Sequence, residues 1–130
     1  MIALPDFHDG FFDGLWISEK KIVRLFLRTS NGERSTIVLR DVERLSTSNF
    51  LQGNIILDVV LVDPGRLTSA HIEQLYWPQE AKAEAETAQQ PLRSAQERSL
   101  WALEINPSYG AEFTALFKAI ETSPNHVLGN

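Results

Sequence analysis

Alternating apolar and polar residues early in the chain predict a β-hairpin over residues 21–40. Its first half alternates valine and leucine with arginine, which is the period of a strand that buries one face. Its second half is rich in β-branched residues. Asn31 and Gly32 lie between the halves and tolerate the positive φ angles of a type I′ turn. If these two residues form the loop, Leu25 pairs with Val38 across the hairpin.

Three further segments have the patterns of strands, namely residues 11–18, 55–62 and 101–105. Gly10 and Gly14 indicate a bulge or a close approach of another backbone at the first of them. The second is apolar on both faces apart from Asp58, which predicts a central strand covered on both sides. A buried Asp58 carboxylate would need a hydrogen-bonded or charged partner, and Arg24 and Arg40 on neighbouring strands are candidates for a charged one.

The patterns that predict helices cover fewer residues than those that predict strands. Asp41 can cap a single helical turn that follows it, and Ile72, Leu75 and Tyr76 have the i, i+3, i+4 spacing of a short helix. Residues 111–121 match both an amphipathic helix and an alternating strand; the periodicity favours the helix, and the strand stays open. The chain is therefore predicted to be α+β, a mainly antiparallel sheet with two or three short peripheral helices.

Residues 79–90 differ from the rest of the chain, because they are rich in Ala, Gln, Glu and Lys and contain no large apolar residue. Such a segment cannot bury a face, so it is either a solvated helix or a mobile excursion. Pro91 is expected to break any helix there. We therefore expect one domain over 1–130, with a polar surface insertion or flexible excursion at about 79–99.

Composition and charge argue against several classes of function. The 130 residues include 17 acidic and 12 basic side chains, a net charge of −5, which argues against a nucleic-acid partner. The absence of cysteine excludes disulfides, thiolate nucleophiles and cysteine-ligated zinc. We find no secretory signal pattern and no apolar stretch that could cross a bilayer. A cytoplasmic protein without a membrane partner is expected.

The densest group of polar residues contains Asp6, His8, Asp9 and Asp13. Imidazole and carboxylate groups are common metal ligands and acid–base catalysts, so one hypothesis is a small metal-dependent hydrolase that uses these four residues. The other interpretation is a turn that enters a strand, with an aspartate bonded to local backbone N–H groups. We favour the turn, and we expect neither a cofactor nor a catalytic residue.

A protein contact is the better interpretation of the exposed polar segment. Trp77 precedes a proline and the polar stretch, which makes it a candidate for an exposed aromatic contact. The other two tryptophans alternate with apolar neighbours and are expected in the core. Glu80, Glu84 and Glu86 would attract a basic partner. Self-association through an unpaired sheet edge is a further alternative.

Four short motifs resemble segments of small, uncharacterised bacterial single-domain proteins, some of which are grouped with the immunity proteins of polymorphic toxin systems. The motifs are Phe7-His8-Asp9-Gly10, the Asn31-Gly32 turn, Gly53-Asn54-Ile55-Ile56-Leu57-Asp58 and Ser108-Tyr109-Gly110-Ala111-Glu112. The resemblance implies a β-rich domain that neutralises a partner by binding it, with a closing strand after Gly110. The leading hypothesis is a non-catalytic protein-binding domain.

Overall fold

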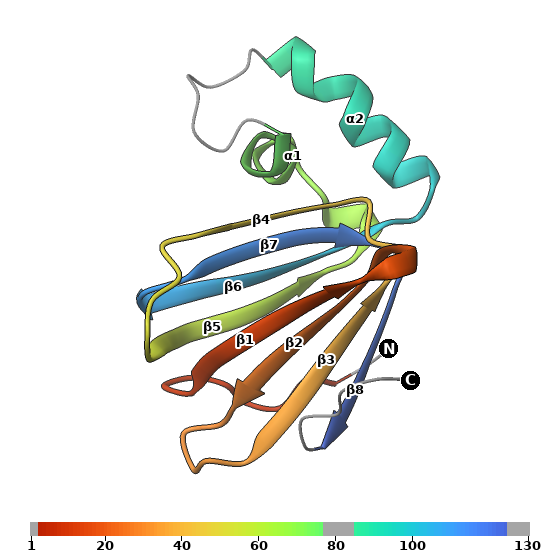
Figure 1. The fold of residues 1–130 in the computed structure, drawn as a ribbon. Helices are drawn as coiled ribbons and strands as arrows, with labels where there is room; N and C mark the ends of the chain where they lie inside the picture. Colours follow the sequence, from red (N-terminus) through yellow and green to blue (C-terminus); the bar gives the residue numbers. More distant parts are fainter. Residues whose placement is uncertain (1–2, 77–84, 125–130) are drawn as a thin grey trace.

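The computed structural model describes residues 3–76 and 85–124 (Figure 1). Two α-helices, α1 (Ser69–Tyr76) and α2 (Ala85–Glu97), accompany the short 3-10 turns η1 (Glu19–Lys21) and η2 (Pro64–Arg66). The strands are β1 (Phe11–Ser18), β2 (Ile22–Arg28), β3 (Arg34–Arg40), β4 (Arg44–Ser48), β5 (Asn54–Val62), β6 (Trp101–Tyr109), β7 (Glu112–Phe117) and β8 (Ala119–Pro124). The predicted α+β class with a mainly antiparallel sheet is confirmed. Among the described residues, no helix is long and apolar enough to span a membrane.

The sheet has the order β4-β7-β6-β5-β1-β2-β3-β8 and folds over on itself into two walls. One wall is β4-β7-β6-β5, and the other is β1-β2-β3-β8. The walls meet at a corner, because β3 bends into β4 while its partner β8 is the continuation of β7. Two backbone hydrogen bonds carry the ladder around this corner, Lys118 N to Arg40 O (3.1 Å) and Glu43 N to Leu116 O (2.8 Å).

The main core lies between the two walls. Every strand contributes to it, and its fully buried side chains include Leu25 of β2, Ile37 of β3 and Phe113 of β7. A second core lies on the outside of the first wall, where α1 and α2 cover the sheet (Figure 1). Ile72 and Leu75 of α1 are buried there, at the spacing from which the helix was predicted.

The predicted hairpin forms from β2 and β3, but with a different register. Leu25 pairs with Ile37 rather than with Val38. The loop is longer than two residues, and Thr29 N donates to the carbonyl oxygen of Glu33 (2.9 Å) across it. A slip of one residue moves every side chain to the opposite face. The observed register places Ile37, rather than Val38, in the core with Leu25.

The favoured helix at 111–121 is wrong, and the strand alternative is correct. This segment forms β7 and β8, separated at Lys118. Phe113 and Phe117 of β7 face the core between the walls, whereas Leu116 faces the helices. A strand that is covered on both sides carries apolar residues on both faces, and their spacing then imitates that of an amphipathic helix.

Three other local predictions are corrected. The segment after Asp41 is the corner that leads into β4, not a helical turn. Strand β5 is central in the order but is exposed over part of its outer face, because β1 pairs with it at only two residues and the helices cover only its end at Val62. Pro91 lies inside α2 and does not break it. The part of the predicted insertion that the structure describes is therefore largely helical.

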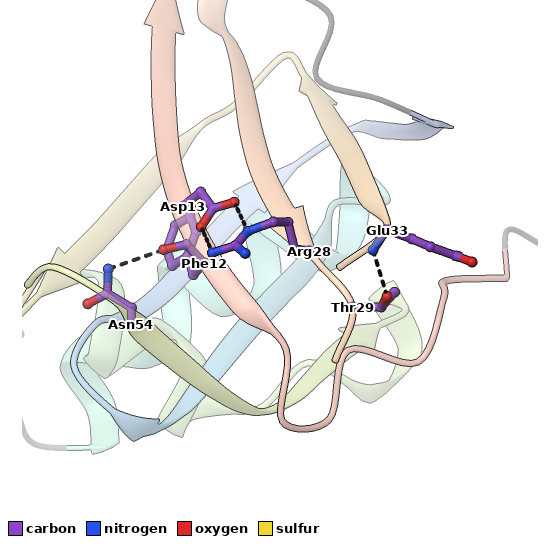
Figure 2. Close-up of polar contacts among 6 residues, drawn as sticks. All are labelled: Phe12, Asp13, Arg28, Thr29, Glu33 and Asn54. Carbon is purple, nitrogen blue, oxygen red and sulfur yellow. Dashed lines mark hydrogen bonds and ion pairs between the residues drawn. The ribbon is translucent and has the colours of Figure 1, made fainter. Parts of the chain in front are cut away.

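The junction between β1 and β5 shows why a glycine is needed at position 10. A Cβ atom on Gly10 would collide with the carbonyl oxygen of Arg28, and the register of β1 shifts between Phe12 and Gly14. The predicted close approach and bulge are both confirmed. Asn54 Nδ2 donates to the carbonyl oxygen of Phe12 (3.1 Å), which joins the two walls where their pairing is shortest (Figure 2).

Candidate functional site

The loop before β1 is fixed against the start of β5. Phe7 is buried in the main core and anchors the loop. Gly10 N donates to the Phe7 carbonyl (2.7 Å) and closes the turn, while Asp9 N donates to the carbonyl oxygen of Ile56 (2.9 Å). Asp9 has a φ of 61°, in the left-handed region that aspartate tolerates better than most residues. The side chains of the loop are therefore presented from a defined backbone.

His8 is the centre of this loop. Its Nδ1 donates to the carbonyl oxygen of Leu57 (2.8 Å), and its backbone N–H donates to Asp6 Oδ1 (3.0 Å). Its Nε2 lies 3.5 Å from Asp9 Oδ2. The hydrogen bond to the Leu57 carbonyl, followed by the nearby Asp9 carboxylate, raises the pKa of His8 above its ordinary value. Asp6 and Asp58 raise this pKa further.

Three carboxylates therefore lie around one imidazole, and they come from two parts of the chain. Asp6 and Asp9 are in the loop, whereas Asp58 is on β5, where it accepts a hydrogen bond from Asn106 Nδ2 (2.7 Å). Asp58 is exposed, so the expectation of a buried strand carboxylate that needs an arginine partner is wrong. Its place beside His8 follows from the contact between the loop and β5.

Asp13, the fourth residue of the predicted cluster, lies elsewhere. Its two carboxylate oxygens accept hydrogen bonds from Arg28 Nε (2.6 Å) and Nη2 (2.9 Å), as Figure 2 shows. This ion pair raises the pKa of Arg28. Over residues 3–76 and 85–124, no group of three or more His, Asp or Glu side chains could hold a metal ion. The remaining carboxylates instead form an exposed acidic surface.

Exposed apolar side chains adjoin the carboxylates. Leu57, whose carbonyl accepts the His8 hydrogen bond, is 45% exposed. Tyr109 pairs with Ile55 on the same part of β5 and is 52% exposed. Phe50 and Leu51 are exposed in the β4–β5 loop at this end of the sheet (Figure 1). The His8 surface is defined here as Asp6, His8, Asp9, Phe50, Leu51, Leu57, Asp58 and Tyr109.

Asn54 holds the loops of the His8 surface together. This buried side chain accepts hydrogen bonds from the backbone N–H groups of Leu51 and Ala111, both at 2.9 Å. Its Nδ2 donates to the carbonyl oxygens of Phe12 (3.1 Å) and Leu51 (2.8 Å). A single amide thus joins β1, the β4–β5 loop and the β6–β7 turn. The exposed aromatic and leucine side chains are therefore carried by a connected frame.

Of the other predicted contact residues, Glu86 alone belongs to the part of the chain that the structure describes. Trp77, Glu80 and Glu84 fall outside the described residues, and Glu86 lies in α2. Trp16, one of the two tryptophans expected in the core, is 40% exposed on β1.

The sequence did not indicate Leu57 and Tyr109 as surface residues. Leu57 is in an apolar run that predicts burial, and its exposure depends on how early β1 leaves β5. Tyr109 follows Asn106-Pro107, where a strand was expected to stop, whereas β6 continues through it. Comparison of the chain with models of protein families, with curated proteins and with solved structures finds no match.

Proposed function

We propose that this protein is a non-catalytic protein-binding domain, of the immunity type that neutralises a partner by occupying its surface. We further propose that it binds through the His8 surface. The observation that supports this most is the exposure of Leu57 and Tyr109 beside carboxylates, on strands β5 and β6 next to the loop and the turn that Asn54 connects. Protein interfaces commonly combine a few apolar or aromatic anchors with a polar rim.

The negative charge of the His8 surface indicates the charge that its proposed partner would have. Asp6, Asp9 and Asp58 surround one histidine, and the whole chain has a net charge of −5. A partner with arginine or lysine side chains around an apolar centre would complement this arrangement. Long-range attraction would increase its association rate, whereas the apolar centre would control its dissociation.

The test compares capture of a partner from a lysate of the source cells by four forms of the protein. The first is unchanged, and the second carries Leu57→Ser and Tyr109→Ser. The third carries Asp6→Asn, Asp9→Asn and Asp58→Asn. The fourth is a control with the same change of charge on exposed residues elsewhere, namely Glu33→Gln, Asp41→Asn and Glu97→Gln.

We expect one stoichiometric protein to be captured by the unchanged and control forms and lost by the other two. Raising the salt concentration should weaken this capture, because exposed charges are screened. Equal capture by all four forms would contradict the assignment to the His8 surface. A fifth form with Glu80→Gln, Glu84→Gln and Glu86→Gln then tests the polar segment at about 79–99 as the binding surface.

A further inference from the structure

A buried arginine lies on the outer face of the second wall. Arg24 of β2 stands between Trp16 of β1 and Val38 of β3 in the sheet register. Its neighbours Val23 and Leu25 point into the main core, so alternation directs Arg24 to the opposite face. Arg24 is nevertheless only 5% exposed. Arginine is rarely buried to this extent unless its charge is paired.

No anion pairs with Arg24 among the described residues. Its guanidinium carbon lies 5.2 Å from the centroid of the Trp16 ring, and among those residues this cation–π contact is the one ionic, hydrogen-bonding or ring interaction of the Arg24 side chain. Two more exposed arginines on the same wall have carboxylate partners, Arg28 in Asp13 and Arg40 in Glu121. Arg24 is thus more buried than Arg28 and Arg40, and yet the described residues give it no carboxylate partner of the kind that those two arginines have. A ligand anion would supply it.

Arg24 lines an open hollow of about 540 Å³. A volume of this size suits a small ligand or a single side chain of a partner. The remaining lining residues belong to β1, the β1–β2 turn and the start of β2, and they are Trp16, Ile17, Ser18, Glu19, Lys20 and Ile22. The hollow therefore offers an indole ring, two isoleucines and two cations, with one carboxylate on its lining.

The turn beside the hollow has an uncommon backbone. Lys20 and Lys21 both occupy the left-handed region, with φ angles of 66° and 60°. Glycine and asparagine are the residues that usually fill such positions in hairpin turns. The turn is held in place because Val42 N donates to the carbonyl oxygen of Lys21 (3.0 Å). A costly conformation thus places Lys20 on the lining of the hollow.

We propose that this hollow binds a monoanionic carboxylate attached to a flat or apolar group. The Arg24 guanidinium would hold both carboxylate oxygens through its paired N–H groups, a geometry that suits arginine. Trp16 and Ile22 would cover the apolar part. The exposed charges of Lys20 and Glu19 have opposite sign and cancel. The hollow then has one uncompensated positive charge, that of buried Arg24, and a ligand with one negative charge would balance it. A phosphate dianion would exceed that charge and meet Glu19.

The carboxylate can belong to a free acid or to the C-terminus of a peptide, and the probes distinguish the two. Phenylacetate and phenylacetamide differ only in the charged group, and inorganic phosphate is the anion control. A short peptide that ends in phenylalanine is used with a free and with an amidated C-terminus. Binding is followed by two-dimensional amide NMR spectra and by the Arg24 Nε–H signal, which report on the hollow directly.

Phenylacetate or the free-acid peptide is expected to shift the signals of residues 16–24 saturably, whereas phenylacetamide, the amidated peptide and phosphate leave them unchanged. Arg24→Met should weaken binding by about tenfold to a hundredfold, the effect of losing a charged hydrogen bond. Arg66→Met, which removes an exposed arginine outside the hollow, is the matched control and should bind normally. Arg24→Lys keeps the charge without the paired donors and should weaken binding by about tenfold.

A second readout separates a ligand site from a structural arginine. Without ligand, Arg24→Met should raise the thermal midpoint of unfolding or leave it unchanged, because a buried charge without a partner is replaced by an apolar side chain of similar length. A lowered midpoint would make Arg24 a structural residue and overturn the proposal. So would equal shifts from the acid and its amide, or normal carboxylate binding by Arg24→Met.

Discussion

Asn54 offers a sharp test of how the two walls are held together. The side chain is 2% exposed and makes four hydrogen bonds to backbone groups, two as acceptor and two as donor. Replacement by alanine removes all four partners. The N–H group of Ala111 and the carbonyl of Phe12 are then left in buried surroundings, whereas the two groups of Leu51 are only partly buried and can reach water.

The expected loss follows from the two buried groups. Each buried backbone group without a partner costs about 1–3 kcal/mol, so Asn54→Ala should lower the free energy of unfolding by about 2–6 kcal/mol. This is a large part of the roughly 5–15 kcal/mol that stabilises an ordinary domain. Asn54→Asp should also destabilise, because a carboxylate replaces the amide donor and would face the carbonyl oxygens of Phe12 and Leu51.

Urea denaturation followed by circular dichroism measures both changes, with the slope of the transition checked for two-state behaviour. Asn106→Ala is the matched control, since Asn106 makes one exposed hydrogen bond to Asp58. This control should lose less than about 1 kcal/mol. If Asn54→Ala unfolded at the same urea concentration as the control, the role given to the Asn54 hydrogen bonds would be refuted.

Two further predictions concern the glycines and His8. Gly10→Ala should destabilise by about 1–3 kcal/mol or more in the same denaturation assay, because its Cβ would collide with the Arg28 backbone. Gly14→Ala, whose Cβ would meet only the Phe26 side chain at 3.8 Å, should stay within about 1 kcal/mol of the parent, and equal losses would contradict the packing argument. The pKa of His8 is raised, so its stabilising contribution is present below pH 6.5 and is lost as the pH rises through the higher folded value. NMR titration of the His8 ring should give that higher value, and His8→Gln should remove this part of the pH dependence of stability. An unshifted titration would contradict the contacts with Leu57 and Asp9.

Period-2 patterns predicted most of the sheet but not how its strands pack. Strands β2 and β6 follow from local alternation, because each has one face toward the main core, whereas β1 and β5 were predicted from short runs with apolar residues on both faces. Strand β7 has apolar residues on both faces, since the second core covers its outer side, and its pattern therefore matched a helix. The register of β2 and β3 depended on which residues of β3 enter the core, and turn chemistry alone favoured a shorter loop.

The sequence also predicted only part of the candidate site, because it shows which residues are neighbours in the chain but not which strands bring residues together. Asp6, His8 and Asp9 come together because they are neighbours in one turn. The pairing of Asp13 with Arg28 across β1 and β2 depends on sheet register, and the approach of Asp58 depends on how the loop lies along β5. Neither is visible from spacing in the sequence. Tertiary contacts decide which of several nearby carboxylates share a surface.

The distribution of locally unfavourable features supports the assignment of function to the surface of the sheet rather than to its interior. Between the walls, the buried polar side chain of Asn54 is fully bonded. The features that cost stability lie on the outer surface of the sheet. They are exposed Leu57 and Tyr109, the left-handed lysine pair, and buried Arg24, for which residues 3–76 and 85–124 provide no anion. Folding alone does not require any of them, because a polar residue, an Asn-Gly turn or an apolar side chain would serve the same positions. The contacts with other molecules that we propose would give such residues a role at these positions.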